Sequence, residues 1–277
     1  MAKGRKMYKT GSNKKIIIVK TVKKSKQKPK EGNQFGSGNS GIQTPNGSKS
    51  KPKEILPDIK NLEKEVLKSI IGQDVAVRKI VTAIYRAMNF KTVKSNILVI
   101  GNSGTGKTET IKQIAKRLNI PYTIEDATKY TQEGYYGADV NEMILNLLEN
   151  ANMDIKKAQN GIIVIDEIDK KAGHEVSHDV AGTEVLKSLL KIIEGTTIKV
   201  PVETDSYNVK LVDFDTKNII IIFLGAFSGL DIIRDKRLNS NPLGFSIKEE
   251  THKSKAKFLK QDLVKYGLPE EFVGRID

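Results

Sequence analysis

The sequence predicts an α/β protein, a three-layer α/β/α sandwich around a mostly parallel sheet. Helical and strand patterns alternate from Pro57 onward, and the expected strands at 97–100, 162–165 and 219–224 are apolar throughout. Strands that are apolar on both faces are typical of parallel sheets covered by helices on both sides. The longest apolar stretch, 219–227, is far shorter than the roughly 20 residues of a membrane-spanning helix.

Apolar residues at helical spacing predict a helix from Ile59 to Ile70 and a second from 74 to about 90. A third is expected at 107–118, directly after the strand 97–100 and a glycine-rich loop. The stripe from Val140 to Ile155 predicts one long helix that gives way at Gly161 to the strand 162–165. A further helix over 185–193 precedes the last strand.

Length and composition fit one large globular domain, which we expect to span 54–277. The chain has 277 residues, 38% of them hydrophobic, and no cysteine. Disulfides, thiolate metal sites and cysteine nucleophiles are therefore excluded. We expect a cytoplasmic protein that does not associate with membranes.

The net charge of +14 lies in residues 1–53, which hold fourteen lysines, Arg5 and one acid, Glu31. The 32 basic and 32 acidic residues of the remainder cancel. The tail is also rich in Gly, Ser, Asn and Pro, so we expect it to be disordered. A solvated arm is the simplest interpretation, and binding to nucleic acid, binding to an acidic partner and targeting remain alternatives. Its one apolar run, 16–19, is a candidate docking strand.

A phosphate-binding loop is predicted between the strand 97–100 and the helix from 107. Its glycines let backbone N–H groups close around phosphate oxygens, Lys107 would reach the β and γ phosphates, and Thr108 would bind Mg²⁺ through its hydroxyl. A glycine-rich turn with an exposed lysine is the alternative. The loop and the residue after it are candidates for binding nucleotide: Gly101, Asn102, Ser103, Gly104, Thr105, Gly106, Lys107, Thr108 and Glu109.

Two adjacent carboxylates, Asp166 and Glu167, follow the apolar strand 162–165. Open α/β sheets bind their ligands at the carboxyl ends of the strands, and successive residues there point in different directions. Asp166 could therefore hold Mg²⁺ while Glu167 faces the water that attacks the γ phosphate. The alternative is that these acids and Asp169 only mark a polar strand exit. Together with the loop, the pair predicts binding and hydrolysis of ATP with Mg²⁺.

These motifs resemble, in the same order, those of the AAA+ protein unfoldases of the ClpX type, from about Ile70 to Arg275. The resemblance implies a P-loop NTPase fold of the AAA+ large-domain kind, with Ile70 and Ile71 in the adenine pocket. It implies that Tyr135 and Tyr136 form a pore loop that grips an unfolded or tagged protein. The segment 179–184 is similar to the second pore loop, and 223–227 to the strand that holds a nucleotide sensor.

Partners are implied by the same resemblance. Leu243, Gly244 and Phe245 resemble the tripeptide that docks on a ClpP-like peptidase, and Arg275 resembles the arginine that enters the neighbouring subunit's active site. This implies a homo-oligomer, a hexamer as in the family, acting as a chaperone.

Three departures from the family change what we expect. The family's cysteine-ligated zinc domain is replaced by the basic tail, and the stretch matching a basic pore-mouth loop, 203–215, is acidic. The family continues beyond the position of Asp277 into a small helical domain, which we expect to be missing or truncated here. Three functions stay open: an unfoldase subunit, a nucleic-acid-associated AAA+ ATPase, and a truncated regulator that binds nucleotide without hydrolysing it.

Overall fold

The computed structural model describes residues 17–19, 58–89, 96–130, 140–173, 180–205, 208–239 and 257–276. Its main sheet has five strands in the order β1-β2-β7-β4-β3. The strands are β1 (Ile17–Val19), β2 (Asn96–Ile100), β7 (Ile220–Gly225), β4 (Ile162–Asp166) and β3 (Tyr122–Asp126). The neighbouring pairs among β2, β7, β4 and β3 are parallel, and β1 joins β2 antiparallel.

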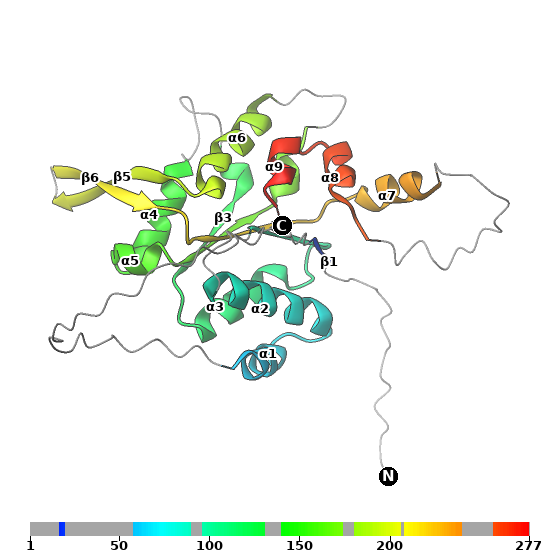
Figure 1. Ribbon diagram of the computed structural model, residues 1–277, viewed down its shortest axis with the longest axis horizontal. Coiled ribbons are helices and arrows are strands. Elements are labelled where there is room, and N and C mark those ends of the chain that lie inside the picture. Colours follow the sequence, from blue (N-terminus) through cyan, green and yellow to red (C-terminus); the bar gives the residue numbers. More distant parts are fainter. Residues whose placement is uncertain are drawn as a thin grey trace, which may run out of the picture.

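Helices cover both faces of this sheet (Figure 1). On one face lie α1 (Ile59–Leu67), α2 (Asp74–Asn89) and α3 (Lys107–Arg117). On the other lie α4 (Val140–Asn150), α5 (Ile155–Ala158), α6 (Val180–Glu194), α8 (Lys260–Tyr266) and α9 (Glu270–Gly274), with α7 (Leu230–Asn239) extending to one side. The predicted three-layer sandwich is confirmed.

The core is two apolar layers, one on each face of the sheet. Alternate residues of the central strands enter each layer, because side chains alternate along a strand. In β2, Leu98 and Ile100 face the α4 and α6 side, while Ile97 and Val99 face α2 and α3. This alternation explains why the side chains on both faces of each central strand are apolar, as the sequence shows.

The long helix expected over 140–155 is wrong, because the chain breaks between α4 and α5. Asn152 and Met153 have φ values of 54° and 60°, in the left-handed region. The carboxylate of Asp154 then accepts a bond from the Lys157 amide at 3.1 Å and starts a new helix. The apolar stripe concealed the break because Ile155 packs against the same layer as α4.

The acidic stretch compared with a pore-mouth loop lies in an antiparallel hairpin of β5 (Thr197–Asp205) and β6 (Asn208–Asp215). Figure 1 shows this hairpin projecting beyond the main sheet. Two short 3₁₀ helices, η1 (Ala127–Lys129) and η2 (Ile168–Lys171), follow β3 and β4.

The tail contributes β1, from the apolar run that the sequence marks as a docking strand. Ile18 pairs with Val99 on the edge of the main sheet. No helix in the described ranges combines the length and apolarity needed to cross a bilayer.

Candidate functional site

The predicted phosphate loop connects the end of β2 to the start of α3. Gly104 and Gly106 have φ values of 73° and 82°, a backbone conformation that favours glycine. A Cβ added at either would meet no atom within 4 Å, so the space beside the loop is open. The N-terminus of α3 begins at Lys107 and presents its first N–H groups at this loop.

Lys107 is buried at the base of the loop. Its ammonium donates to the carbonyl oxygens of Gly101 at 2.5 Å and Asn102 at 3.0 Å. Burial lowers the pKa of Lys107, and the nearby charges of Asp166 and Asp169 oppose that shift. A buried ammonium with this environment gains from a further anion, which is what a phosphate group supplies.

The two predicted motifs meet at one hydrogen bond. Thr108, in the first turn of α3, donates through Oγ1 to Oδ2 of Asp166 at the end of β4, 2.8 Å away. The residues are 58 positions apart in the chain. Their proximity follows from the parallel sheet, in which β2 and β4 both flank β7 and end at the same edge.

Glu167 diverges from Asp166 as expected of successive residues. Its side chain is exposed, whereas Asp166 is half-buried, and its φ of 57° is left-handed. Its amide donates to Asp166 Oδ1 at 2.9 Å. A left-handed conformation is unfavourable for a residue other than glycine and occurs often at functional sites.

Asp169 has a positioning role that the sequence did not reveal. It is buried, and its carboxylate accepts bonds from the amides of Ala226 at 3.3 Å and Phe227 at 3.1 Å. It thereby ties the exit of β4 to the exit of β7. The Gly101 amide in turn donates to the Gly225 carbonyl at 3.1 Å, so all three strand exits are connected. The only signal in the sequence was an acid three residues after Asp166.

The residues present fit a nucleoside triphosphate with Mg²⁺. An open glycine loop, a helix N-terminus and a buried lysine match phosphate chemistry. The hydroxyl of Thr108 and the carboxylate of Asp166 are the oxygen ligands that Mg²⁺ prefers. The described residues contain no group of three His, Cys, Asp or Glu side chains able to hold a metal alone. Mg²⁺ bound here would therefore share its shell with phosphate oxygens and water.

Other candidates are brought together only in part. Ile70 is buried in the layer under α1 and α2, whereas Ile71 is 92% exposed. Only Ile71 can therefore present its side chain to a ligand without rearrangement. Asn102, Ser103 and Glu109 are exposed around the loop.

Arg275 lies at the opposite edge of the sheet from the phosphate loop. Its carbonyl accepts a bond from Asn96 Nδ2 at 2.9 Å, and Asn96 is the first residue of β2, whose last residue precedes the loop. A guanidinium nitrogen, Nη2, pairs with Oε1 of Glu194 at the end of α6.

Several candidates implied by the family resemblance lie outside the described residues. They are Tyr135 and Tyr136, the docking tripeptide Leu243, Gly244 and Phe245, and Asp179 of the second pore loop. The sensor's polar side chain also stays unplaced, because β7 ends in Gly225 and is followed by Ala226 and Phe227.

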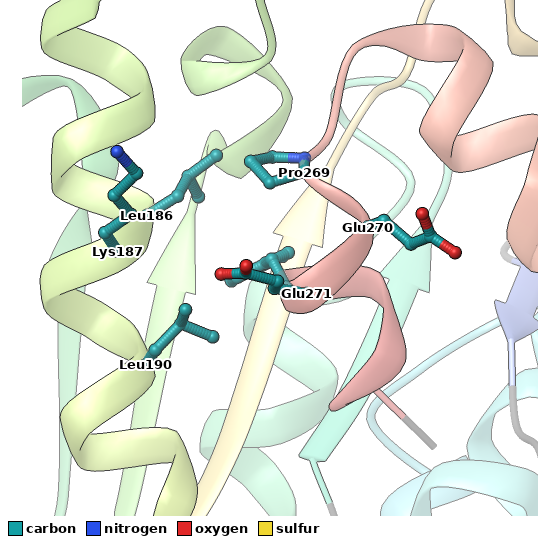
Figure 2. Close-up of a pocket in the computed structure, with 7 residues that line it drawn as sticks. Leu186, Lys187, Leu190, Pro269, Glu270 and Glu271 are labelled. Carbon is teal, nitrogen blue, oxygen red and sulfur yellow. The ribbon is translucent and has the colours of Figure 1, made fainter.

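A groove of about 400 Å³ lies between α6 and α9, away from the phosphate loop. Figure 2 shows Leu186, Lys187 and Leu190 on one wall and Pro269, Glu270 and Glu271 on the other. Its lining is part apolar and part charged, with Lys187 facing two glutamates, and it has none of the glycines of a phosphate loop.

Comparison with known proteins agrees with this geometry. A family model described as an AAA domain of the Cdc48 subfamily matches residues 92–277. The chain is 40% identical over 243 residues to a Treponema denticola protein named ATP-dependent Clp protease ATP-binding subunit ClpX, covering 80% of this chain and 59% of that one. ClpX proteins of Borrelia duttonii and Borrelia recurrentis are each 40% identical over 242 residues, covering 80% of this chain and 56% of theirs. This chain thus spans less than two thirds of the length of these relatives. The chain belongs to the AAA domain family and is an AAA+ ATPase of the ClpX type.

Proposed function

We propose that this chain binds ATP with Mg²⁺ and hydrolyses it as one subunit of a hexameric ring that unfolds and translocates proteins. One observation carries the nucleotide chemistry. The Thr108 hydroxyl and the Asp166 carboxylate lie 2.8 Å apart at the sheet edge where the glycine loop opens. A metal-binding hydroxyl and carboxylate beside a phosphate loop are the combination that phosphoryl transfer requires.

Each side chain has a distinct part in this proposal. The loop amides and Lys107 bind and orient the phosphates, and Thr108 and Asp166 hold Mg²⁺, which when bound neutralises phosphate charge. Glu167 accepts the proton of the attacking water, because its carboxylate is exposed beside Asp166 rather than engaged with Thr108. Asp169 keeps the strand exits in register.

Arg275 serves a neighbouring subunit's nucleotide in this proposal. Its backbone is bonded to the first residue of β2, and the strand separates it from its own phosphate loop by about 13 Å along the strand axis. A guanidinium is suited to the spreading charge of the transferred phosphoryl group. Hydrolysis would then depend on assembly.

The further partners rest on similarity to relatives named as subunits of an ATP-dependent protease. On this basis Tyr135 and Tyr136 grip an unfolded or tagged substrate, and Leu243, Gly244 and Phe245 dock a ClpP-like peptidase. An aromatic side chain grips varied polypeptides through apolar contact, and a hydrophobic tripeptide suits an interface anchor.

The test is ATP turnover over a range of protein concentrations, with mass followed by light scattering. Turnover per chain should rise as rings form, since Arg275 acts between subunits. Glu167→Gln should retain ATP binding and lose turnover by roughly a hundredfold or more, because the base is removed. Binding without turnover at any concentration would instead identify a nucleotide-binding regulator, and turnover by a monomer would exclude the role of Arg275 in trans.

A further inference from the structure

The ion pair between Glu194 and Arg275 joins the end of α6 to the end of α9. Both side chains are partly exposed, Arg275 at 45% and Glu194 at 41%. The pair uses the Nη2 nitrogen of Arg275. A guanidinium carries five N–H donors, so donors remain for a phosphate while Glu194 is bound.

The backbone on the Arg275 side of this pair is firmly placed. Phe272, one turn earlier, is fully buried with its ring edge-on to Phe223 of β7, at 4.9 Å between ring centres. Val273 and Ile276 are also buried, and Asn96 holds the Arg275 carbonyl. The main chain of Arg275 is therefore fixed against the sheet, and only its long side chain is left to be oriented.

The backbone on the Glu194 side is fixed in the same way. Thr216 donates through Oγ1 to the carbonyl of Thr196 at 2.9 Å, and Thr196 donates through Oγ1 to the carbonyl of Lys191 at 2.9 Å. These bonds secure the turn after α6 to the segment that leads into β7. The backbone that carries Glu194 is thus fixed, and its carboxylate lies beside the guanidinium at the end of the long Arg275 side chain.

The groove between α6 and α9 is lined by Leu186 and Leu190 of α6 and by Phe272 of α9. Leu186, Leu190 and Glu194 follow one another at four-residue steps, so they lie on one face of α6. Arg275 comes three residues after Phe272, which lines the other wall. The ion pair of Glu194 and Arg275 therefore connects α6 and α9 on the α6 face that carries Leu186 and Leu190.

We propose that Glu194 is a positioning residue, which holds one side of the Arg275 guanidinium so that its other donors point toward the nucleotide of a neighbouring subunit. This inference rests on the proposed function. Ordering a long side chain before binding removes an entropic penalty that would otherwise be met at each encounter. An exposed ion pair contributes little to the folding of one subunit, so its effect should be on turnover.

Mixed rings separate this effect from folding. The donor chain carries Glu167→Gln, which keeps Arg275 but cannot hydrolyse, and the acceptor chain carries Arg275→Ala, which keeps its own phosphate chemistry. The two chains should be inactive alone and active when mixed. Adding Glu194→Ala to the donor should lower turnover of the mixture roughly tenfold, as expected when a catalytic arginine is less well oriented.

The same substitution in the acceptor is the matched comparison. That chain has no arginine to position, so Glu194→Ala there should add no further loss. Glu194→Asp in the donor should restore part of the turnover, and Glu149→Ala, which removes an exposed carboxylate from α4, should leave it unchanged. Equal losses from Glu194→Ala in donor and acceptor, or no loss in either, would overturn this inference alone. An inactive mixture without any Glu194 change would contradict the proposed function itself.

Discussion

Neighbouring residues in this chain have different surroundings, and the strand exits show it best. Asp166 is half-buried and bonded to Thr108, whereas Glu167 turns outward with a left-handed backbone. That divergence was predictable from the geometry of successive residues at a strand end. The 2.8 Å contact with Thr108 was not, since it depends on two strands being placed on either side of β7.

Gly225 illustrates how little room there is at these exits. A Cβ added there would lie 2.5 Å from the Phe227 ring and 2.7 Å from Asp169 Oδ1. Gly225→Ala should therefore lower the free energy of unfolding by about 2 kcal/mol through overpacking. It should also weaken nucleotide binding, because the Gly225 carbonyl accepts the Gly101 amide.

The matched control for this prediction is Gly274→Ala, where an added Cβ would meet no atom within 4 Å. That variant should be as stable as the parent or slightly more stable, since alanine restricts the unfolded chain. Urea unfolding measures both free energies. Equal stability of the two variants would show that the crowding at Gly225 is relieved by movement of Phe227.

At the scale of elements, α7 and α8 are joined by a charged pair in a buried setting. Arg237 donates to Asp262 through Nε at 2.7 Å and Nη2 at 2.9 Å, and the Leu259 amide donates to the same carboxylate at 2.8 Å. Asp262 is fully buried. Burial acts to raise the pKa of Asp262, but the bonds from Arg237 and Leu259 outweigh it and hold the pKa below its ordinary value of about 3.8.

Arg237→Gln should lower the free energy of unfolding by about 3 kcal/mol at pH 7, because it leaves a buried carboxylate without its cation. In the parent, the lowered pKa contributes stability above pH 4 that is lost as the pH falls through it. In Arg237→Gln we expect burial to dominate and to raise the pKa of Asp262. The destabilisation caused by its buried charge should therefore decrease as the pH falls. The difference in free energy of unfolding between the parent and Arg237→Gln, measured by urea unfolding, should therefore decrease from pH 7 to pH 4.

Arg78→Gln, in α2, is the matched control for Arg237→Gln. Arg78 pairs with Glu63 at 2.8 Å, but its side chain is 69% exposed, so its removal should cost under about 1 kcal/mol. If Arg237→Gln lost as little free energy of unfolding as Arg78→Gln, or if its loss did not change with pH, α7 and α8 would be held together by apolar contact alone.

At the scale of the whole molecule, the positive charge and the catalytic geometry belong to different parts of the chain. Residues 1–53 carry a net charge of +14, and the rest is formally neutral. We therefore expect any binding of DNA to reside in the tail and to fall steeply with salt, about a thousandfold between 50 and 200 mM if some six phosphates are neutralised.

Replacing Lys23, Lys24, Lys26, Lys28 and Lys30 with Gln tests this charge while leaving β1 intact. Fluorescence anisotropy with a labelled DNA duplex should show weaker binding and a shallower salt slope, with ATP turnover unchanged. Unaltered DNA binding in that variant would place the nucleic-acid surface elsewhere, and a parallel loss of turnover would favour a nucleic-acid-associated ATPase.

The sequence alone determined the features that depend on neighbouring residues. The glycine loop between a strand and a helix, the apolar strands and the acidic pair after β4 are local patterns, because backbone conformation and side-chain alternation act over a few residues. The strand β3 was not predicted, although Tyr122 and Ile124 alternate with polar residues as expected of a strand. The break between α4 and α5 was not predicted, because the residues on both sides of it pack against the same apolar layer.

Tertiary structure alone decided which distant groups meet. Strand order brings Thr108 to Asp166 and Asp169 to the exit of β7, and it buries Ile70 while leaving Ile71 exposed. It also places Arg275 beside Glu194, at the edge of the sheet away from its own phosphate loop. Such contacts join segments many residues apart, and they are set by how whole layers pack rather than by the residues adjacent in the chain.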